Sequence, residues 1–425
     1  MAKSMDDALK PRKLWIVNQY ATPPSLPGIT RHYSLGKHLV EMGWDVTVFT
    51  SNYRHETRKN YIPNLRGKMQ TVEFGGVKFV FVRQHVHYQT NGVARILNIL
   101  EFGKNVYQLM VNTHWQNKPD IIIGSSFHFL NVEAAFKVAK RTGAVPFLEI
   151  RDLWPEALVY LRGISRGHPV VRLLMAEKRK LYKLSRGVIT LSKAIESDVK
   201  THFPQKPTLV SPNPVDLQLF SSIDLDQWKQ LAPFKQILNS SAKTKLIYIG
   251  TVGEANAFEV IFQTAVFLRN FDIDFFVVGH GEKFREYKAR SEKEGLRIFF
   301  HAPVPKQAIP TLLSLADGLV AAIHPSFALY GGSMNKLNDY MAAGKPIFYS
   351  GPKANTPFEE VDCAVLVEPF SPQALAHEIK KFHSSPTLFK KKASLCKKYV
   401  VNNYSSSALA MRLSEFLERH FDAEH

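Results

Sequence analysis

The stretch YGGSMNKLNDYMAAGKPIFYS, residues 330–350, carries a helix signal and a strand signal on either side of one glycine. Apolar residues recur from Met334 to Met341 at the spacing of one helix face. Gly344, just before a Lys-Pro pair, is typical of a helix end, and the run 347–349 is typical of a buried strand. The stretch therefore predicts a helix that leads directly into a strand, which is the repeating unit of a parallel α/β sheet.

The same alternation of strands and helices runs through both halves of the chain. In the first half, strands are predicted at residues 13–18, 45–50, 120–125, 145–150 and 187–192. In the second half, they are predicted at residues 245–250, 274–279, 297–302, 318–323 and 345–350. Because helical patterns lie between the strands, we predict an α/β protein with two Rossmann-like, doubly wound domains facing across a cleft.

A proline-rich segment without helical periodicity, residues 203–216, separates the two series of strands. We therefore expect an N-terminal domain over residues 1–212 and a C-terminal domain over residues 213–405. Serines followed by an amphipathic pattern predict a further helix within residues 406–425. This C-terminal helix could pack back on the N-terminal domain.

The charge is unevenly divided along the chain. Of 425 residues, 45% are hydrophobic and 22% are charged, which is typical of a globular protein, and the net charge is +18. Residues 1–210 contain 31 Lys and Arg against 15 Asp and Glu, so nearly all the excess lies in the first half. This asymmetry predicts an anionic partner there, such as nucleic acid, an acidic membrane or a phosphorylated substrate. A basic surface without a specific partner is the alternative.

The cysteines and the N-terminus bear on the compartment. Cys363 and Cys396 are too few for a disulfide framework and suggest a reducing compartment. The first 20 residues contain acidic side chains and only a short apolar run, unlike a signal peptide or a membrane anchor. No apolar run approaches the roughly 20 residues of a spanning helix. We therefore expect a cytoplasmic protein.

Two glycine-led helix starts are candidate phosphate sites, because the first amides of a helix are unpaired and attract anions. One follows Gly332 and carries Lys336 and Asp339 one turn apart. The other follows Gly28 and lacks the GxGxxG dinucleotide fingerprint. The alternatives are a capped helix with a surface ion pair at the first site and an ordinary turn at the second.

Several segments resemble the family-4 glycosyltransferases, which are retaining enzymes of the GT-B type. The resemblance rests on MAAGKPI (341–347), VVGHGEKFREYKA (277–289), FHAPVPKQAIPTLLSLADGLVAAIHP (300–325), SPNPVDLQLF (211–220) and PGITRHYSLGKHLVEMGWDVTVFTS (27–51). The stretch RDLWPEALVYL (151–161) resembles the branch that includes N-acetylfucosamine transferases of O-antigen and capsule assembly. The resemblance covers nearly the whole chain.

The resemblance implies a reaction and its partners. A sugar, expected to be an N-acetylated amino sugar, would pass from a UDP-linked donor to an undecaprenyl-diphosphate-type glycolipid or a saccharide acceptor. The product would enter bacterial surface polysaccharide. Enzymes of this type are described as needing neither a metal nor a cofactor. The leaving phosphate helps to take the acceptor proton, so no protein nucleophile is required.

The resemblance also implies the donor-binding residues. The base would lie near Val304, and Asp339 would hold the ribose. The diphosphate and the remainder of the donor would meet Gly28, His280, Gly332, Ser333, Met334, Asn335 and Lys336. This sequence departs from the family pattern at two places: Gly331 stands where the first Glu of Glu-x7-Glu is usual, and the segment 250–260 lacks the usual basic pair. A non-catalytic descendant, or a nucleotide-sugar epimerase on the same scaffold, therefore stays open.

Three residues are candidates for the reacting centre. Asp152 could orient an acceptor hydroxyl or the donor sugar, and Arg151 could meet an anionic group. His128 follows a predicted strand, although a histidine there often makes only structural hydrogen bonds. An ion pair between Arg151 and Glu156 is the structural alternative for those two residues.

Basic stretches suggest contact with a membrane. Residues 168–187 combine an apolar face, including Leu181 and Leu184, with basic residues that include Lys178, so this helix could lie on an anionic membrane at the inner face of the cell. Alternatively, the apolar face simply covers a sheet. Residues 54–95 add further positive charge, but no nucleic-acid-binding motif accompanies them, so we expect no nucleic acid partner.

Overall fold

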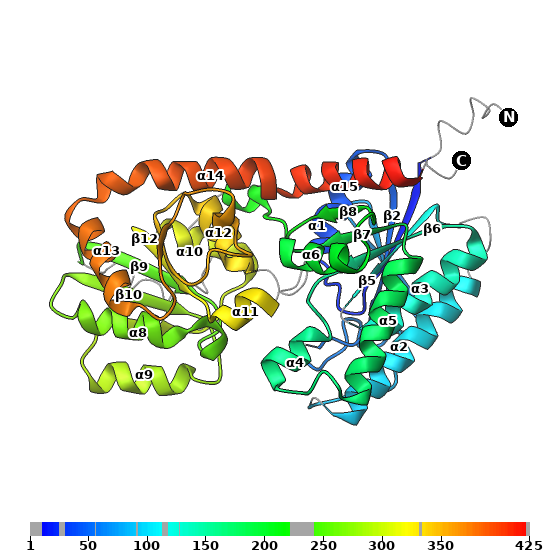
Figure 1. Ribbon diagram of the computed structural model, residues 1–425, viewed down its shortest axis with the longest axis horizontal. Helices are drawn as coiled ribbons and strands as arrows, with labels where there is room; N and C mark the ends of the chain where they lie inside the picture. The colour runs from blue at the N-terminus through cyan, green and yellow to red at the C-terminus, as the bar shows by residue number, and fades with distance from the viewer. Residues whose placement is uncertain are drawn as a thin grey trace. The chain divides into compact units, whose positions relative to one another are not determined.

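The computed structural model describes residues 11–24, 30–55, 57–90, 92–112, 118–126, 128–221, 242–330 and 334–421. The chain divides into two compact units (Figure 1). The first unit runs to Pro214 and takes up the chain again from Ser406, and the second unit is Val215–Ser405. Each unit is described separately below.

The first unit is built on an eight-stranded sheet in the order β3-β4-β2-β1-β5-β6-β7-β8. Its strands are β1 (Lys13–Val17), β2 (Asp45–Ser51), β3 (Met69–Phe74), β4 (Val77–Val82), β5 (Ile121–Ser125), β6 (Val145–Ile150), β7 (Gly187–Thr190) and β8 (Thr208–Val210). All neighbouring strands are parallel except β3 and β4, which form an antiparallel pair at one edge. The central strands are almost wholly buried, as expected when helices cover both faces.

Seven helices belong to the described part of the first unit. They are α1 (Arg31–Glu41), α2 (Val93–Asn112), α3 (Phe129–Thr142), α4 (Glu156–Arg162), α5 (Pro169–Leu184), α6 (Lys193–His202) and α15 (Ser406–Phe421). The last of these comes from the far end of the chain and packs against α1. Leu413 and Leu417 of α15 enter the core, and Trp44 Nε1 donates a hydrogen bond of 2.9 Å to Ser414 Oγ.

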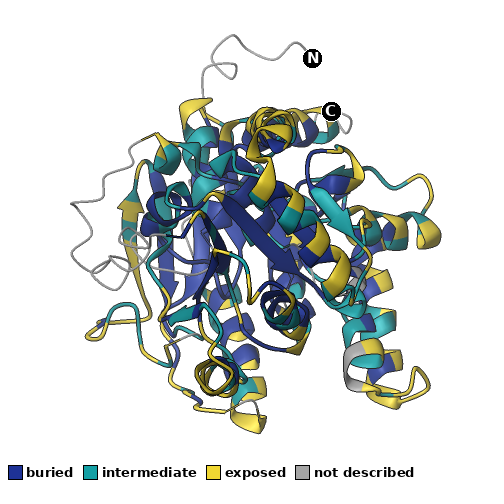
Figure 2. Ribbon diagram, turned by 90° about the vertical axis from the view of Figure 1, so that its left-hand side faces the viewer, coloured by how far each residue is buried: buried dark blue, intermediate teal, exposed yellow. Residues whose placement is uncertain are grey.

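The second unit is built on a six-stranded parallel sheet in the order β11-β10-β9-β12-β13-β14. Its strands are β9 (Thr244–Ile249), β10 (Ile273–Val278), β11 (Ile298–His301), β12 (Gly318–Ala322), β13 (Ile347–Ser350) and β14 (Val365–Val367). Its helices are α8 (Phe258–Phe267), α9 (Phe284–Lys293), α10 (Ile309–Ser314), α11 (Pro325–Tyr330), α12 (Asn335–Ala343), α13 (Pro372–Ser384) and α14 (Lys390–Tyr404). Figure 2 shows the central strands as buried, whereas the outward faces of many helices are exposed.

Both sheets reverse their strand order at one point. In the second unit, the chain adds β10 and β11 on one side of β9 and then β12, β13 and β14 on the other. In the first unit, the corresponding reversal lies between β1 and β5. At such a point the connections leave in opposite directions and open a crevice at the carboxyl ends of the strands, where ligands bind in sheets of this kind.

The predicted fold class is confirmed, and each of the ten predicted strands is present. Four strands were not predicted: β3, β4, β8 and β14. In the described part of the chain, no helix has both the length and the apolar character needed to cross a bilayer.

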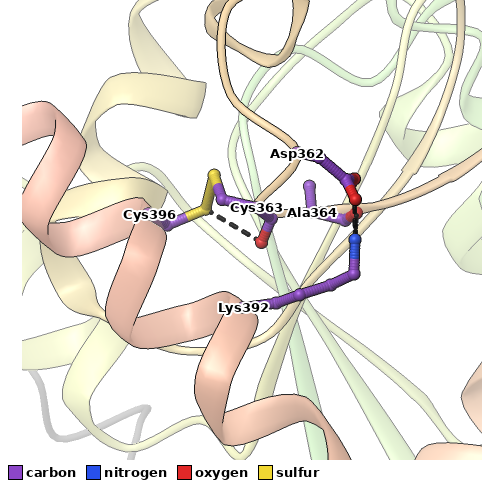
Figure 3. Close-up of a disulfide and its surroundings, with 5 residues drawn as sticks. All are labelled: Asp362, Cys363, Ala364, Lys392 and Cys396. Atoms are coloured by element: carbon purple, nitrogen blue, oxygen red, sulfur yellow. Dashed lines mark hydrogen bonds and ion pairs between the residues drawn. A yellow bond between two sulfur atoms is a disulfide. The ribbon is translucent and has the colours of Figure 1, made fainter.

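The two cysteines form one disulfide, which we did not expect from the sequence (Figure 3). Cys363 lies just before β14 and Cys396 lies in α14, and Cys396 Sγ is 3.1 Å from the carbonyl oxygen of Cys363. Lys392, one turn earlier in α14, donates a hydrogen bond of 2.7 Å to Asp362. These contacts hold α14 against the edge of the sheet. A single bridge of this kind staples one helix and is not a framework for the fold.

Candidate active site

The backbone is closely packed at the carboxyl ends of β9 and β10 in the second unit. After β9, the Gly250 amide donates to Val278 O (3.0 Å) and the Val252 amide donates to His280 O (2.7 Å). A Cβ on Gly279 would lie 1.9 Å from the carbonyl oxygen of Gly250, so only glycine fits there. The loops after β9 and β10 are thus joined to each other by hydrogen bonds, which fixes this part of the carboxyl edge.

Helix α12 is anchored at the point where the strand order reverses. Leu337, Tyr340 and Met341 are fully buried in the core of the unit. The Tyr340 hydroxyl accepts a hydrogen bond of 2.7 Å from the Ile249 amide, at the end of β9. The helix ends at Gly344, whose φ of +65° suits glycine. This anchoring fixes the first turn of α12, and hence Lys336, beside the carboxyl end of β9.

The side chain of Lys336 points at the end of β9. Its Nζ donates hydrogen bonds to Asn256 Oδ1 (2.5 Å) and Tyr248 Oη (3.2 Å), and it lies 4.5 Å from the centre of the Tyr248 ring. A Cβ on Gly250 would lie 2.6 Å from Nζ, so the glycine makes room for the lysine. Neither a hydroxyl, an amide oxygen nor an aromatic face carries a full negative charge. Burial among such groups lowers the pKa of Lys336 to about 7.

Asp339 lies one turn further along α12 and keeps part of its surface exposed. Burial raises the pKa of its carboxyl to about 6, although the positive charge of Lys306 opposes the change. The alternative of a surface ion pair between Lys336 and Asp339 is wrong, because Lys336 Nζ bonds Asn256 and Tyr248 instead. Lys336 and Asp339 therefore do not pair with each other.

The remaining predicted donor residues of the second unit lie at or near its carboxyl edge. Met334 is the N-cap of α12 and packs partly against the core, and the exposed Asn335 is the first residue of the helix. The exposed His280 follows β10, and its carbonyl accepts the Val252 amide. Val304 lies partly buried in the loop after β11. Three further predicted residues, Gly28, Gly332 and Ser333, lie outside the described residues.

A buried polar network underlies the carboxyl edge of the first unit. Glu149 of β6 accepts hydrogen bonds from Arg31 Nε (2.8 Å), and its other oxygen lies 2.8 Å from His32 Nε2. Ser125 Oγ, at the end of β5, donates to Glu149 Oε2 (2.5 Å) and accepts from Asn18 Nδ2 (2.7 Å). Burial alone would raise the pKa of Glu149, but Arg31 and His32 hold it well below its usual range. The network joins the ends of β1, β5 and β6 and thereby fixes the carboxyl edge of this sheet.

A group of aromatic, histidine and arginine residues lies at this edge. We call it the edge cluster: Tyr20, His55, Arg58, Tyr88, Arg95 and His128. Tyr20 Oη is 3.1 Å from His128 Nε2, and His55 Nδ1 is 2.7 Å from Tyr88 Oη. The members follow the ends of β1, β2, β4 and β5 or begin α2. Residues far apart in the sequence are thus gathered on one edge of the sheet.

The histidines of the edge cluster are neutral near pH 7. Burial, with the charge of Arg95, lowers the pKa of His128 to about 3. Burial and the same arginine lower the pKa of His55 to about 4. A base of such low pKa takes up a proton poorly near neutrality. His128 is therefore better suited to hydrogen bonding a substrate than to removing its proton.

Arg151 and Asp152 follow β6 at the same edge of the sheet. Arg151 is buried, and its amide donates a hydrogen bond of 3.3 Å to Ser126 Oγ. Burial raises the pKa of Asp152, although the charge of Arg151 opposes this. The alternative ion pair of Arg151 with Glu156 is not the one formed, because Glu156 accepts a hydrogen bond from Lys178 of α5. Arg151 and Asp152 thus lie together, largely buried, just after β6.

In the basic helix, α5, the residues that face the core differ from those predicted. Lys178 is 1% exposed and bonds Glu156 and Asp198 (3.0 Å to the latter). Leu184, which we placed on the covered face, is exposed, as is Leu173. The inward face therefore contains a buried ion triad, and part of the apolar surface faces out.

A hollow of about 720 Å³ lies at the opposite edge of the first unit. Its lining includes Val145 and Arg186, just at or before the starts of β6 and β7, together with Lys206. Because ligand sites of such sheets form at the carboxyl ends of the strands, this hollow is not the candidate site. Within the described ranges, His, Cys, Asp and Glu do not gather in threes as metal ligands would.

Several residues of the site escaped the sequence analysis. Tyr248 and Asn256 hold Lys336, yet neither belongs to a motif, and they lie 88 and 80 positions away from it. Tyr20, His55 and Tyr88 were likewise missed. For Tyr20 and His55 the one available signal is their place soon after predicted strands of a parallel sheet, where side chains of different strands meet. Tyr88 follows β4, which was not predicted, so it had no such signal.

Two families match the chain. Residues 28–219 match the family described as "Glycosyltransferase Family 4", and residues 243–385 match the family described as "Glycosyl transferases group 1". The two matches cover most of both units. With the two Rossmann-like sheets, they make this chain a glycosyltransferase of family 4 with the GT-B fold.

Individual relatives are more distant. WcaI of Escherichia coli (strain K12), provisionally named a colanic acid biosynthesis glycosyl transferase, is 26% identical over 322 residues, which cover 70% of this chain and 74% of WcaI. HepE of Anabaena, solved with UDP and glucose, is 14% identical with a TM-score of 0.65, covering 96% of this chain and 100% of that one. The catalytic domain of starch synthase IV from Arabidopsis thaliana, bound to ADP and acarbose, is 12% identical with a TM-score of 0.71, covering 97% and 100%. The likeness to these solved structures shows the shared fold.

Proposed function

We propose that this glycosyltransferase moves a sugar, an N-acetylated amino sugar, from a UDP-linked donor to a lipid-linked or saccharide acceptor during bacterial surface polysaccharide synthesis. The likeness to WcaI supports a role in polysaccharide synthesis. UDP in the structure of HepE supports the choice of nucleotide. The resemblance of RDLWPEALVYL (151–161) to the N-acetylfucosamine transferase branch supports the amino sugar. The reaction would take place at the inner face of the membrane.

The geometry of Lys336 carries the proposal. Breaking the bond between the anomeric carbon and the phosphate leaves negative charge on the departing diphosphate. Lys336 is a cation at the reversal point of the sheet whose partners are dipoles, Tyr248 and Asn256. A diphosphate would supply the full negative charge that these partners lack. Because the site is partly buried, the attraction would be stronger than it is in water and would grow as charge develops.

The first turn of α12 would add to this effect. The start of a helix carries partial positive charge, and Met334 and Asn335 lie at the start of α12. Asp339, one turn on, could accept hydrogen bonds from the ribose hydroxyls. The base would lie near Val304, in the loop after β11, and His280, Gly28, Gly332 and Ser333 would complete the donor site.

The reaction would retain the configuration at the anomeric carbon. The acceptor oxygen would attack from the side that the phosphate leaves, and a phosphate oxygen would take the acceptor proton. The new glycosidic bond thus forms as the sugar–phosphate bond breaks, and the products are the glycoside and UDP. Asp152 would orient the acceptor hydroxyl or the donor sugar, Arg151 would meet an anionic group, and His128 would hydrogen bond the substrate.

A ligand screen followed by product analysis tests the proposal. Bound ligand raises the melting temperature by mass action, so nucleoside diphosphates and their sugars are compared first by thermal shift. We expect uridine nucleotides to stabilise the protein most. The stabilising sugar nucleotide is then incubated with and without lipid acceptor, and transfer is expected only with acceptor. Conversion of the donor alone would instead indicate an epimerase, and no shift with any nucleotide would contradict the proposed donor site.

A further inference from the structure

A second hollow, with a volume of about 520 Å³, lies in the second unit. Its lining includes Thr244 at the start of β9, Asp317 just before β12 and Pro346 just before β13. The hollow therefore lies at the amino ends of these strands, whereas Lys336 lies beside the carboxyl end of β9. Small-molecule sites have volumes of about 300–1,000 Å³, so a ligand of ordinary size would fit this hollow.

Four lysines line the hollow, and they come from three separate segments of the chain. Lys243 precedes β9, Lys345 lies between α12 and β13, and Lys390 and Lys397 belong to α14. A spacing of seven residues places the last two on one face of α14, and Ser394 of the same face also lines the hollow. None of the four ammonium groups forms an ion pair or a hydrogen bond with another described residue. We call these four residues the lysine cluster.

Little negative charge balances the lysine cluster. Asp317 is the one carboxylate among the described residues of the lining, and its Oδ2 accepts a hydrogen bond of 2.8 Å from the Lys245 amide. Burial lowers the pKa of Lys345, and the charge of Lys245 acts in the same direction, although Asp317 opposes them. Four positive charges thus lie around one carboxylate that already has a partner, and the ammonium groups repel one another.

A phosphate-bearing ligand would supply the missing negative charge. Lysine binds phosphate as a point charge with three hydrogen-bond donors, and the Ser394 hydroxyl adds a further hydrogen-bonding group. Phe382, Pro346 and Pro386 give the lining an apolar part, against which the remainder of a ligand could pack. The hollow thus combines the volume of a small-molecule site with the charge that phosphate requires.

We propose that the lysine cluster binds a free, phosphate-bearing small molecule at a site separate from the candidate donor site. The phosphate oxygens accept hydrogen bonds from the lysines, and the ligand joins α14 to the starts of β9 and β13. The occupant is a free molecule and not a membrane lipid, because the lysines line a concave space that a flat bilayer surface does not enter. The inference goes beyond the proposed function and does not depend on the role of Lys336.

Inorganic pyrophosphate is the probe, and calorimetry measures its binding to Lys336→Met, which lacks the cation of the candidate donor site. We expect binding to persist in this background. Adding Lys390→Gln/Lys397→Gln should weaken it by roughly tenfold or more, because two charged hydrogen-bond donors are lost. Lys391→Gln/Lys398→Gln is the matched control, since these exposed lysines have the same separation on α14 and neither lines the hollow. The control should bind pyrophosphate as the background does.

Thermal melting tests the same site with a second variant. Neutralising Lys390 and Lys397 relieves repulsion within the lysine cluster, so the melting temperature of the ligand-free protein should not fall. Pyrophosphate should raise the melting temperature of Lys336→Met by mass action, and it should do so less when Lys345→Gln is added. An equal rise with and without Lys345→Gln would contradict the site.

Three calorimetric results would overturn the proposal. The first is no binding of pyrophosphate to Lys336→Met. The second is equal weakening by the two pairs of α14 substitutions, which would indicate a general attraction to positive charge. The third is a loss, in Lys390→Gln/Lys397→Gln, of binding to phosphatidylglycerol vesicles alone, which would make the lysines a membrane contact. Failure of the donor site appears separately, as unchanged affinity of Lys336→Met for UDP-glucose, and leaves this comparison intact.

Discussion

Lys336 Nζ lies 3.2 Å from the hydroxyl of Tyr248 and 4.5 Å from the centre of its ring. Tyr248 is itself fully buried, and its hydroxyl donates a hydrogen bond of 2.7 Å to Thr251 O. The ring is therefore a fixed support that holds the ammonium at the end of β9. The segment 250–260 lacks the basic pair usual in family 4, and a lysine from α12 places a cation beside this segment instead.

Gly250 tests whether the position of Lys336 matters for donor binding. Its φ of +143° is unfavourable for other residues, and a Cβ there would lie 2.6 Å from Lys336 Nζ. We expect Gly250→Ala to displace the lysine and to weaken UDP binding roughly tenfold, with a stability loss of about 1–3 kcal/mol from the backbone strain. Calorimetry with UDP and urea unfolding measure the two effects. Gly253→Ala is the control, because a Cβ there meets nothing closer than 3.5 Å.

The affinity for a diphosphate donor should fall at both high and low pH. Lys336, with a pKa of about 7, loses its proton as the pH rises, and a diphosphate prefers the protonated form. Affinity should therefore fall above pH 7, by up to about tenfold per unit until the pKa of the complex is reached. Asp339, with a pKa of about 6, is protonated at lower pH and becomes a poorer acceptor for the ribose. Affinity should thus also fall below pH 6.

UDP-glucose is the suitable probe for this profile, because a terminal phosphate titrates near pH 6 and would confuse the measurement with UDP. Calorimetry from pH 5 to 9 should show an optimum between roughly 6 and 7. Lys336→Arg keeps its charge over this range, so the fall above pH 7 should disappear in that variant. A profile that stays the same in Lys336→Arg would show that another group titrates.

The buried triad around Lys178 should serve stability and not donor binding. Removing one partner of a buried ion pair leaves the others without compensation, so Lys178→Ala should cost about 3–5 kcal/mol in the free energy of unfolding. Lys180, on the same helix, is half exposed and pairs with Glu133 (2.7 Å). Lys180→Ala should change stability by no more than about 1 kcal/mol. Urea unfolding distinguishes the two, and similar losses in both would contradict a special role for the triad.

Three of the four missed strands are either exposed or very short. The fourth, β4 (Val77–Val82), is mostly buried and was missed within a stretch that we interpreted only by its charge. The ten predicted strands are apolar runs, such as β12 (Gly318–Ala322), in which every residue is buried. In contrast, β3 (Met69–Phe74) lies at a sheet edge with four of its six residues exposed, and its sequence lacks an apolar run. We interpreted it as part of a basic surface. The strands β8 and β14 have three residues each, too few for a periodic signal.

The helices show a similar limit. Periodicity correctly placed Leu337, Tyr340 and Met341 on the buried face of α12. In α5, periodicity placed Lys178 outside and Leu184 inside, and both assignments were wrong. The sequence of one helix does not reveal that carboxylates from other elements, Glu156 and Asp198, surround a lysine and make its burial favourable.

The part of the candidate site that comes from one short segment could be predicted from the sequence, and the part that joins distant segments could not. A glycine pair, a helix start and a lysine lie within a few residues of one another, so their combination is visible in the sequence. The contacts of Lys336 with Tyr248 and Asn256 join segments 80 or more positions apart. Only the fold brings these segments together, and the edge cluster likewise depends on the order of β1, β2, β4 and β5 in the sheet.

The affinity of Lys336→Met for UDP-glucose, measured by calorimetry at pH 6.5, tests the central claim most directly. Methionine keeps an apolar stem of similar length and removes the charge together with the hydrogen bonds that Nζ donates. We predict that affinity falls roughly 10- to 100-fold, as expected for the loss of a hydrogen bond between charged groups, and that the melting temperature of the free protein is not lowered. Wild-type affinity in Lys336→Met would contradict the assignment of this lysine to the donor diphosphate.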